Sequence, residues 1–105
     1  MPEFVTIRRW ALREGGEEQD LVALVRDAII PAYKEQVGCL ELELLRTSEP
    51  HAYLAITHWD SRGSFEAWSG PAGQAWRDRH RATLERWLAL MAFQAEWDAE
   101  EVASS

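Results

Sequence analysis

Two segments in the middle of the chain alternate between apolar and polar residues and are separated by only four residues. The first is CLELELLR (39–46), in which leucines alternate with glutamates, and the second is HAYLAITHW (51–59). Such alternation is typical of β-strands that bury one face, and the intervening TSEP has the composition of a turn. The two segments therefore predict an antiparallel hairpin, which any fold of this chain has to place in a sheet.

An amphipathic segment precedes this hairpin. Its apolar residues recur at three- and four-residue steps, which indicates a helix of about five turns. The stripe consists of Leu21, Leu24, Val25, Ala28, Ile29, Ala32 and Tyr33. Pro31 falls inside the stripe and predicts a kink or a local break, and Gly38 has the usual place of a glycine that closes a helix.

A second amphipathic segment follows the hairpin. It begins near Ser61, and SGPAG, from Ser69 to Gly73, interrupts it. We expect the helix to resume after this interruption with one apolar side. That side consists of Trp76, His80, Leu84, Trp87, Leu88 and Met91.

Two further strands are predicted near the ends of the chain. In the first, Val5 and Ile7 share one face, and the other face carries Phe4, Thr6, Arg8 and Trp10. The last strand lies in AFQAEWDAE and is weaker in pattern. With right-handed crossovers, the order β-α-β-β-α-β gives an α+β, ferredoxin-like fold, in which an antiparallel four-stranded sheet has both helices on one face. We expect a single domain over residues 3–99 and a frayed tail over residues 100–105.

Charge and cysteine content exclude several classes of partner. The formal net charge is −7, so nucleic acid and anionic membranes are poor partners for this chain. Cys39 is the only cysteine, which excludes an internal disulfide and a cysteine-based metal site. No apolar run reaches the length of a signal peptide or a membrane span, and we expect a cytoplasmic protein.

Tryptophan is unusually frequent, with six in 105 residues. So many rings cannot all lie at the centre of a small domain, and some have to line an opening or a subunit interface. We expect the uncovered face of the sheet to carry Trp10 and Trp59. An exposed apolar face of that kind predicts a homodimer in which two sheets pack face to face and close into a barrel.

The order of motifs has a counterpart in a known family. GCLELELL after a helix, the hairpin, and then ITHWDSRGSFEAW and a helix with His80 resemble the antibiotic biosynthesis monooxygenase domains of the dimeric α+β barrel group. The resemblance spans nearly the whole chain and implies a homodimer. It leaves the activity open, because the family includes cofactor-independent oxygenases of aromatic polyketides or quinols and haem-degrading enzymes. It also includes many proteins without demonstrated activity.

The haem-degrading branch of that family allows a residue-level comparison. Those enzymes place an asparagine on the first strand, a tryptophan at the end of the short helix and a haem-ligating histidine further along. Trp68 matches the tryptophan, and His80 falls near the histidine if about two extra residues are allowed. Arg8 occupies the position of the asparagine, and the chain contains no asparagine at all. The resemblance therefore disfavours haem degradation by that mechanism.

Trp59 and Trp68, at the joint between a strand and a helix, have two interpretations. They either fill the core at the end of the sheet or form the walls of a pocket beneath the second helix. The interruption at SGPAG favours the pocket, because a cavity mouth or a mobile flap would break the helix there. We therefore expect Trp68 to face a cavity that His80 also reaches. The candidate substrate-binding residues are Trp10, Trp59, Trp68 and Trp76.

His80 and Arg8 are the candidates for catalysis. His80 is either a hydrogen-bonded, half-buried residue or the base that takes a proton from a phenolic substrate. A cofactor-free oxygenase needs that step because the substrate anion itself has to deliver an electron to dioxygen. Arg8 either pairs with a carboxylate across the dimer or holds a substrate oxygen anion.

The remaining residues suggest no metal or cofactor. His51 and His58 match no common spacing of metal ligands, and no phosphate loop or dinucleotide fingerprint is present. Two functions remain. One is a cofactor-independent monooxygenase acting on a small aromatic, polyketide or quinol-like substrate. The other is a non-catalytic dimeric barrel that binds a small apolar ligand or only itself. A haem-binding or haem-degrading protein is a third, less favoured interpretation.

Overall fold

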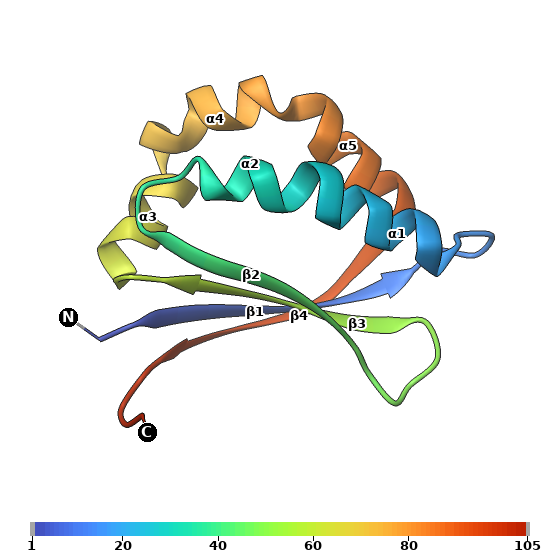
Figure 1. Ribbon diagram of the computed structural model, residues 1–105, viewed down its shortest axis with the longest axis horizontal. Coiled ribbons are helices and arrows are strands. Elements are labelled where there is room, and N and C mark those ends of the chain that lie inside the picture. Colours follow the sequence, from blue (N-terminus) through green and yellow to red (C-terminus); the bar gives the residue numbers. More distant parts are fainter. Residues whose placement is uncertain (1, 105) are drawn as a thin grey trace.

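The computed structural model describes residues 2–104 and contains one four-stranded antiparallel sheet with helices on one of its faces (Figure 1). The strands are β1 (Phe4–Leu12), β2 (Cys39–Arg46), β3 (Ala52–Trp59) and β4 (Met91–Glu100). Their order across the sheet is β2-β3-β1-β4. This arrangement confirms the predicted ferredoxin-like fold, with the hairpin of β2 and β3 on one side of β1 and the last strand on the other.

The helical segment between β1 and β2 is divided at its proline. It consists of α1 (Glu18–Leu24), a π-helical turn η1 (Val25–Ile29) and α2 (Ile30–Lys34). Pro31 has no amide hydrogen and cannot continue the regular hydrogen-bonding ladder, so the preceding turn is widened. The predicted local break is therefore confirmed, and it lies immediately before the proline.

A glycine closes the connection from α2 to β2, as predicted. Gly38 has φ +89°, which is the left-handed conformation that favours glycine. A Cβ atom there would lie 2.4 Å from the hydroxyl of Ser64 and 2.8 Å from a carboxylate oxygen of Asp60. Only glycine therefore allows this turn to pack against the start of α3.

The helical segment between β3 and β4 has four parts. These are α3 (Arg62–Ser69), a 3₁₀ turn η2 (Pro71–Gly73), α4 (Gln74–Arg79) and α5 (Arg81–Leu90). Ser61 caps α3 by accepting a hydrogen bond of 3.2 Å from the backbone N–H of Ser64. Both the start near Ser61 and the interruption at SGPAG are confirmed.

The later part of this segment differs from the prediction of one helix that continues through Met91. The backbone leaves helical geometry at His80, with φ −107° and ψ 19°, and Met91 is the first residue of β4. The break at His80 turns α5 relative to α4. As a result Leu84 and Trp87 face the pocket described below, whereas Leu88 is 53% exposed.

The sheet face beneath the helices carries the large aromatic residues. Trp59 is 1% exposed, and Trp10 packs edge-on against Trp87 of α5 with ring centroids 5.1 Å apart. The prediction that Trp10 and Trp59 lie on the uncovered face was wrong. Their rings supply the core under the helices, and strand alternation places the smaller Val5 and Ile7 on the opposite face.

The uncovered face of the sheet is apolar at its centre. Ile7 lies directly opposite Ile56 of β3 and Trp97 of β4, so these three side chains share that face. Trp97 is 51% exposed. We call this group the open-face strip.

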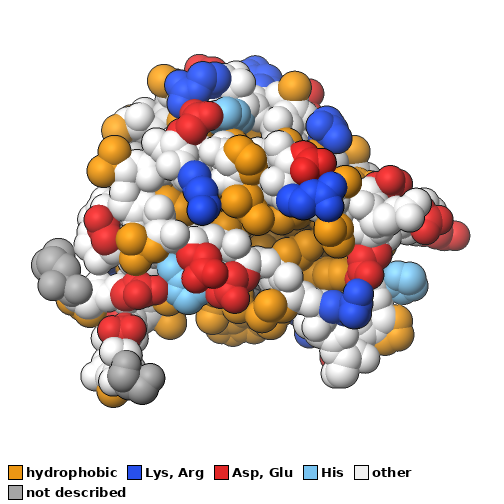
Figure 2. Space-filling model, in the orientation of Figure 1, with side chains coloured by type: hydrophobic (Ala, Val, Ile, Leu, Met, Phe, Trp, Pro, Cys, Tyr) orange, Lys and Arg blue, Asp and Glu red, His pale blue; other side chains and the backbone are white. Residues whose placement is uncertain are grey.

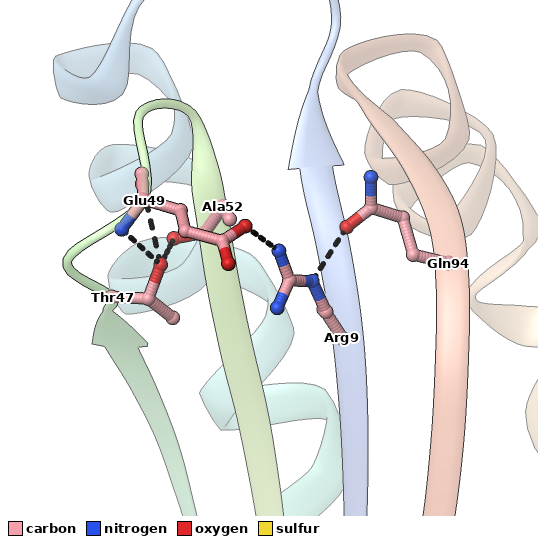
Figure 3. Close-up of polar contacts among 5 residues, drawn as sticks. All are labelled: Arg9, Thr47, Glu49, Ala52 and Gln94. Atoms are coloured by element: carbon pink, nitrogen blue, oxygen red, sulfur yellow. Dashed lines mark hydrogen bonds and ion pairs between the residues drawn. The ribbon is translucent and has the colours of Figure 1, made fainter.

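A polar group borders this face at the hairpin turn (Figure 3). Arg9 of β1 donates a hydrogen bond of 2.8 Å to Gln94 of β4, and its guanidinium pairs with Glu49 in the turn. The Thr47 hydroxyl fixes the same turn by donating a hydrogen bond of 2.8 Å to the carbonyl of Ala52.

Among residues 2–104, no helix has the length and apolar character needed to cross a membrane.

Candidate functional site

A pocket of about 290 Å³ lies between the helix-covered face of the sheet and the helices above it. All four strands contribute to its walls, together with η1, α2, α3 and α5. The space-filling view shows hydrophobic side chains gathered in a hollow between the helical layer and the sheet (Figure 2). Val25 and Ile29, at the two ends of the π-helical turn, form part of this apolar wall. The irregular turn before Pro31 therefore shapes the roof of the pocket.

Aromatic side chains from the β3–α3 joint form one end of the pocket. Trp59 ends β3, and α3 folds back so that the rings of Trp59 and Trp68 have centroids 5.5 Å apart. Phe65 of α3 lies 6.0 Å from each of them. All three residues line the pocket. The motif ITHWDSRGSFEAW thus forms an aromatic wall, one side of which packs into the core while the other side lines the pocket.

Two indole donors in this wall are unpaired. The Nε1 atoms of Trp59 and Trp68 are buried and have no hydrogen-bond partner among residues 2–104. Leaving a buried donor unpaired costs about 1–3 kcal/mol. In contrast, Nε1 of Trp76 donates a hydrogen bond of 2.8 Å to the carbonyl of Ala32. The unpaired donors are therefore confined to the tryptophans that border the pocket.

Arg8 supplies the positive charge in the pocket wall. Its Nε lies 3.1 Å from Glu96, and its Nη1 lies 3.1 Å from Asp98 and donates a hydrogen bond of 3.2 Å to the carbonyl of Trp97. These contacts to β4 hold the guanidinium in place. Nη2 donates no hydrogen bond within the described part of the chain. One edge of the guanidinium is therefore available to a bound molecule.

Tyr33 of α2 adds a phenol to the pocket wall. Burial raises the pKa of its hydroxyl to about 12, and the nearby charge of Arg8 only partly counteracts that rise. Sequence reasoning counted Tyr33 only as a member of an apolar helical stripe. The signal that could have identified it is its place at the end of that stripe, where a ring with a polar tip faces the core.

His80 and Trp76 lie outside the pocket wall, in the contact between α2 and α4. The His80 side chain is 16% exposed, and its Nε2 lies 3.0 Å from a carboxylate oxygen of Glu35. Its ring packs against Trp76 with centroids 5.0 Å apart. Hydrogen bonds from His80 and then Arg79 hold the pKa of Glu35 below its ordinary value. The structure thus brings Arg8, Trp10, Trp59 and Trp68 together in the pocket wall and leaves His80 and Trp76 outside it, with the ring of Trp76 packed against Trp68 at a centroid distance of 5.7 Å.

A second polar cluster lies on the opposite face of the sheet. Ligand atoms of Glu41, Glu43 and His58 fall within 4.8 Å of one another, a spacing that could accommodate a metal ion. His58 is also hydrogen-bonded at both ring nitrogens, 2.7 Å from Glu3 and 2.8 Å from Glu43. Burial opposes protonation, but these two carboxylates outweigh it and raise the pKa of His58. The cluster lies across the sheet from the pocket, and Glu43 is its only member that also lines the pocket wall.

Cys39 and His51 have no role at the pocket. Cys39 is a half-buried free thiol at the start of β2, and burial raises its pKa, which disfavours the reactive thiolate. His51 adopts a left-handed conformation, φ 63°, in the turn of the hairpin.

Comparison with known proteins identifies a family and a set of similar structures. The family described as antibiotic biosynthesis monooxygenase matches residues 4–78. SnoaB, a cofactor-independent oxygenase from Streptomyces nogalater, has 17% identity and a TM-score of 0.68, with 99% of this chain and 97% of that chain covered. No curated sequence is similar enough to this chain to count as a match.

Two further structures share the fold. MhuD, a haem degrader from Mycobacterium tuberculosis with two haems bound, has 25% identity and a TM-score of 0.69, with 97% of this chain and 98% of that chain covered. HapK from Hahella chejuensis has 12% identity and a TM-score of 0.75, with 97% and 95% covered. At these identities the similarities establish the fold, and the chemistry has to be argued from the pocket itself.

Proposed function

The chain belongs to the antibiotic biosynthesis monooxygenase family, and we propose that it is a cofactor-independent monooxygenase acting on a small aromatic, polyketide or quinol-like substrate. The observation that carries the proposal is the pocket. It combines an aromatic wall with a small number of polar side chains, namely Thr6, Arg8, Tyr33, Glu43, Thr57 and Glu96. This composition is typical of sites that bind planar organic molecules.

The size of the pocket narrows the class of substrate. Its volume of about 290 Å³ is at the lower end of the roughly 300–1,000 Å³ typical of ligand sites. A molecule of two or three fused rings suits such a space and can pack against the aromatic wall of Trp59, Phe65 and Trp68. Haem is considerably larger, and His80, the expected axial ligand, lies outside the pocket wall. Both facts support an aromatic substrate over haem.

The proposed reaction needs no cofactor to balance. An activated ring CH₂ group reacts with dioxygen to give a ring carbonyl and water, so the substrate supplies all the electrons. The reaction begins with loss of a proton to form the substrate anion, and Nη2 of Arg8 would stabilise the oxygen on which that charge resides. Two carboxylates line the pocket, and Glu43 is hydrogen-bonded to His58. Glu96, which is ion-paired with Arg8, would therefore accept the proton. His80 would instead support α4 against α2.

A non-catalytic binding protein is the second candidate. The fact that favours it is the position of His80 outside the pocket wall, because no histidine among the described residues then lines the pocket. The same aromatic wall would bind a small apolar ligand without reaction.

A homodimer is part of this proposal. The open-face strip, with Ile7, Ile56 and Trp97, leaves apolar side chains uncovered in a single chain. A second copy packed on this face would bury them and close two sheets into a barrel. We also propose that the protein has no nucleic-acid or anionic-membrane partner, on the basis of its net charge of −7.

Oxygen uptake distinguishes the two candidates. Metal-free protein is mixed with a panel of phenols, quinols and anthrone in an oxygen electrode, and each rate is compared with the rate without protein. A monooxygenase accelerates uptake with at least one member of the panel. A binding protein binds panel members without any acceleration. A parallel haem titration tests the third reading, which requires conversion of bound haem to an open tetrapyrrole.

A further inference from the structure

We propose that the Tyr33 hydroxyl is the hydrogen-bond donor that makes this pocket selective for aromatic ligands with a ring ketone or ring hydroxyl oxygen. This inference deepens the proposed function and rests on it for the identity of the binding site. It assigns a specificity-determining role to a residue that neither the family motif nor the sequence pattern marks.

The ring of Tyr33 is held in one orientation by its neighbours. Its centroid lies 5.5 Å from that of Trp68 and 5.1 Å from that of Trp76, the second contact being edge-on at 74°. Trp76 is itself tied to α2 by its hydrogen bond to the carbonyl of Ala32, the residue before Tyr33. A phenol fixed in this way loses little further freedom when a ligand binds, which favours specific recognition.

The hydroxyl of Tyr33 is not used by the fold. It makes no hydrogen bond with any of residues 2–104, whereas most tyrosine hydroxyls in a protein interior have a partner. It is also absent from the fully buried side-chain atoms that lack a partner, so its oxygen retains accessible surface. Tyr53, the other tyrosine, shows the usual case, because its hydroxyl donates a hydrogen bond of 2.8 Å to Glu18. Tyr33 lies deep enough in the protein for burial to dominate the pKa of its hydroxyl. Its side chain is nevertheless only half-buried by accessible surface, because it borders the pocket.

The protonation state of Tyr33 decides its role. With a pKa of about 12, the hydroxyl keeps its proton at neutral pH. It can therefore donate a hydrogen bond but cannot act as a base. The oxygen of a ring ketone or of a phenolate is a suitable acceptor, whereas an aromatic hydrocarbon has none.

Arg8 strengthens the same preference. It lines the same pocket, and its charge is close enough to act on the Tyr33 hydroxyl. Its Nη2 donates no hydrogen bond within residues 2–104. A ligand whose oxygen atoms lie near these two side chains would receive neutral hydrogen bonds from Tyr33 and charged ones from Arg8, so the pocket favours oxygens that carry partial or full negative charge.

The test compares two probes that share one ring frame. Fluorenone has three fused rings and a ring ketone, and fluorene has the same rings and no oxygen. Binding of each to the wild-type protein and to Tyr33→Phe is measured by isothermal titration calorimetry under nitrogen. We expect Tyr33→Phe to weaken fluorenone binding by about tenfold, the value of one neutral hydrogen bond. Fluorene binding should change by less than about twofold, because the ring of residue 33 is retained.

Tyr53→Phe is the matched control. It removes the same hydroxyl from a tyrosine outside this pocket and should leave the affinity for both probes unchanged. The proposal is overturned if Tyr33→Phe weakens the binding of both probes equally or of neither. It is also overturned if the wild-type protein binds fluorene as tightly as fluorenone, a comparison that does not depend on the folding of any variant.

The outcome is separable from that of the proposed function. Neither probe has to react, so the selective loss of fluorenone binding can be observed in a protein that shows no oxygen uptake. In that case the monooxygenase proposal fails and the role of Tyr33 stands. If the protein consumes oxygen but Tyr33→Phe binds fluorenone as tightly as the wild-type protein does, the monooxygenase proposal stands and the role of Tyr33 is refuted.

Discussion

The indole rings of Trp59 and Trp68 lie against each other with centroids 5.5 Å apart, and neither indole N–H has a hydrogen-bond partner among residues 2–104. Trp59 closes the end of the sheet, whereas Trp68 retains accessible surface at the pocket. Trp59 therefore contributes mainly to the stability of the fold, whereas Trp68 contributes more to the surface that a ligand would contact. That difference leads to the first prediction.

Truncation of these two tryptophans should have unequal effects on stability. Trp59→Ala removes a ring that is 1% exposed and should lower the free energy of unfolding by about 3–5 kcal/mol. Trp68→Ala should lower it by less than about 3 kcal/mol, because one side of that ring already borders a cavity. It should also enlarge the pocket and shift ligand preference toward larger rings. Urea unfolding of both variants provides the measurement, and equal losses would indicate that Trp68 is packed as core.

The homodimer proposal depends on the open-face strip. Trp97→Glu introduces a charge on the uncovered face of the sheet and should convert a dimer into a folded monomer. Sedimentation velocity at micromolar concentration measures the change. Leu88→Glu is the matched control, because Leu88 has a similar exposure, 53% against 51% for Trp97, but lies on α5 on the other side of the sheet. A monomeric wild-type protein, or a Trp97→Glu variant that remains dimeric, contradicts this interface.

The fold and its local signals could be predicted well from sequence. Ser61 caps α3, Pro31 follows a local break and Gly38 closes a turn, because each depends on neighbours a few residues away. Alternation also grouped Phe4, Thr6, Arg8 and Trp10 on one face. It could not tell which face the helices cover, since that depends on packing between distant segments. The error in placing Trp10 and Trp59 came from this step.

The site was harder to predict for the same reason. Helical periodicity placed His80 and Trp87 on one stripe, but the break at His80 turns α5 and leaves His80 beside Glu35. Periodicity assumes an unbroken helix, and no local signal at His80 indicated the break. Tyr33 was missed because an apolar stripe does not reveal whether a hydroxyl at its end finds a partner.

The stability of the protein in acid should depend on Glu18. Hydrogen bonds from Arg46 and then Tyr53 hold the pKa of Glu18 at about 2, below its ordinary value of 4.5. A carboxylate with a lowered pKa contributes stability that is present above its unfolded pKa and is lost as the pH falls through its folded pKa. The free energy of unfolding should therefore decrease between pH 4.5 and about 2.

Glu18→Gln should make that decrease smaller, although solvent screening at this surface site keeps the effect modest. Urea unfolding at a series of pH values between 5 and 2, as an approximate range, measures it. The control is Glu14→Gln, an exposed glutamate that forms no ion pair within the described part of the chain. If the free energy of unfolding falls equally with pH in the wild-type protein and in Glu18→Gln, the contacts of Glu18 with Arg46 and Tyr53 do not stabilise the folded state.

The most direct test of the central claim is the fate of labelled dioxygen. Chelator-treated protein is incubated with anthrone under ¹⁸O₂, and the product is analysed by mass spectrometry alongside a reaction without protein. The account predicts anthraquinone with one ¹⁸O atom in its new carbonyl, formed well above the spontaneous rate, and a rate about 10²-fold lower for Arg8→Met. Equal rates with and without protein, for anthrone and for every phenol and quinol of the panel, would contradict it and leave a binding protein.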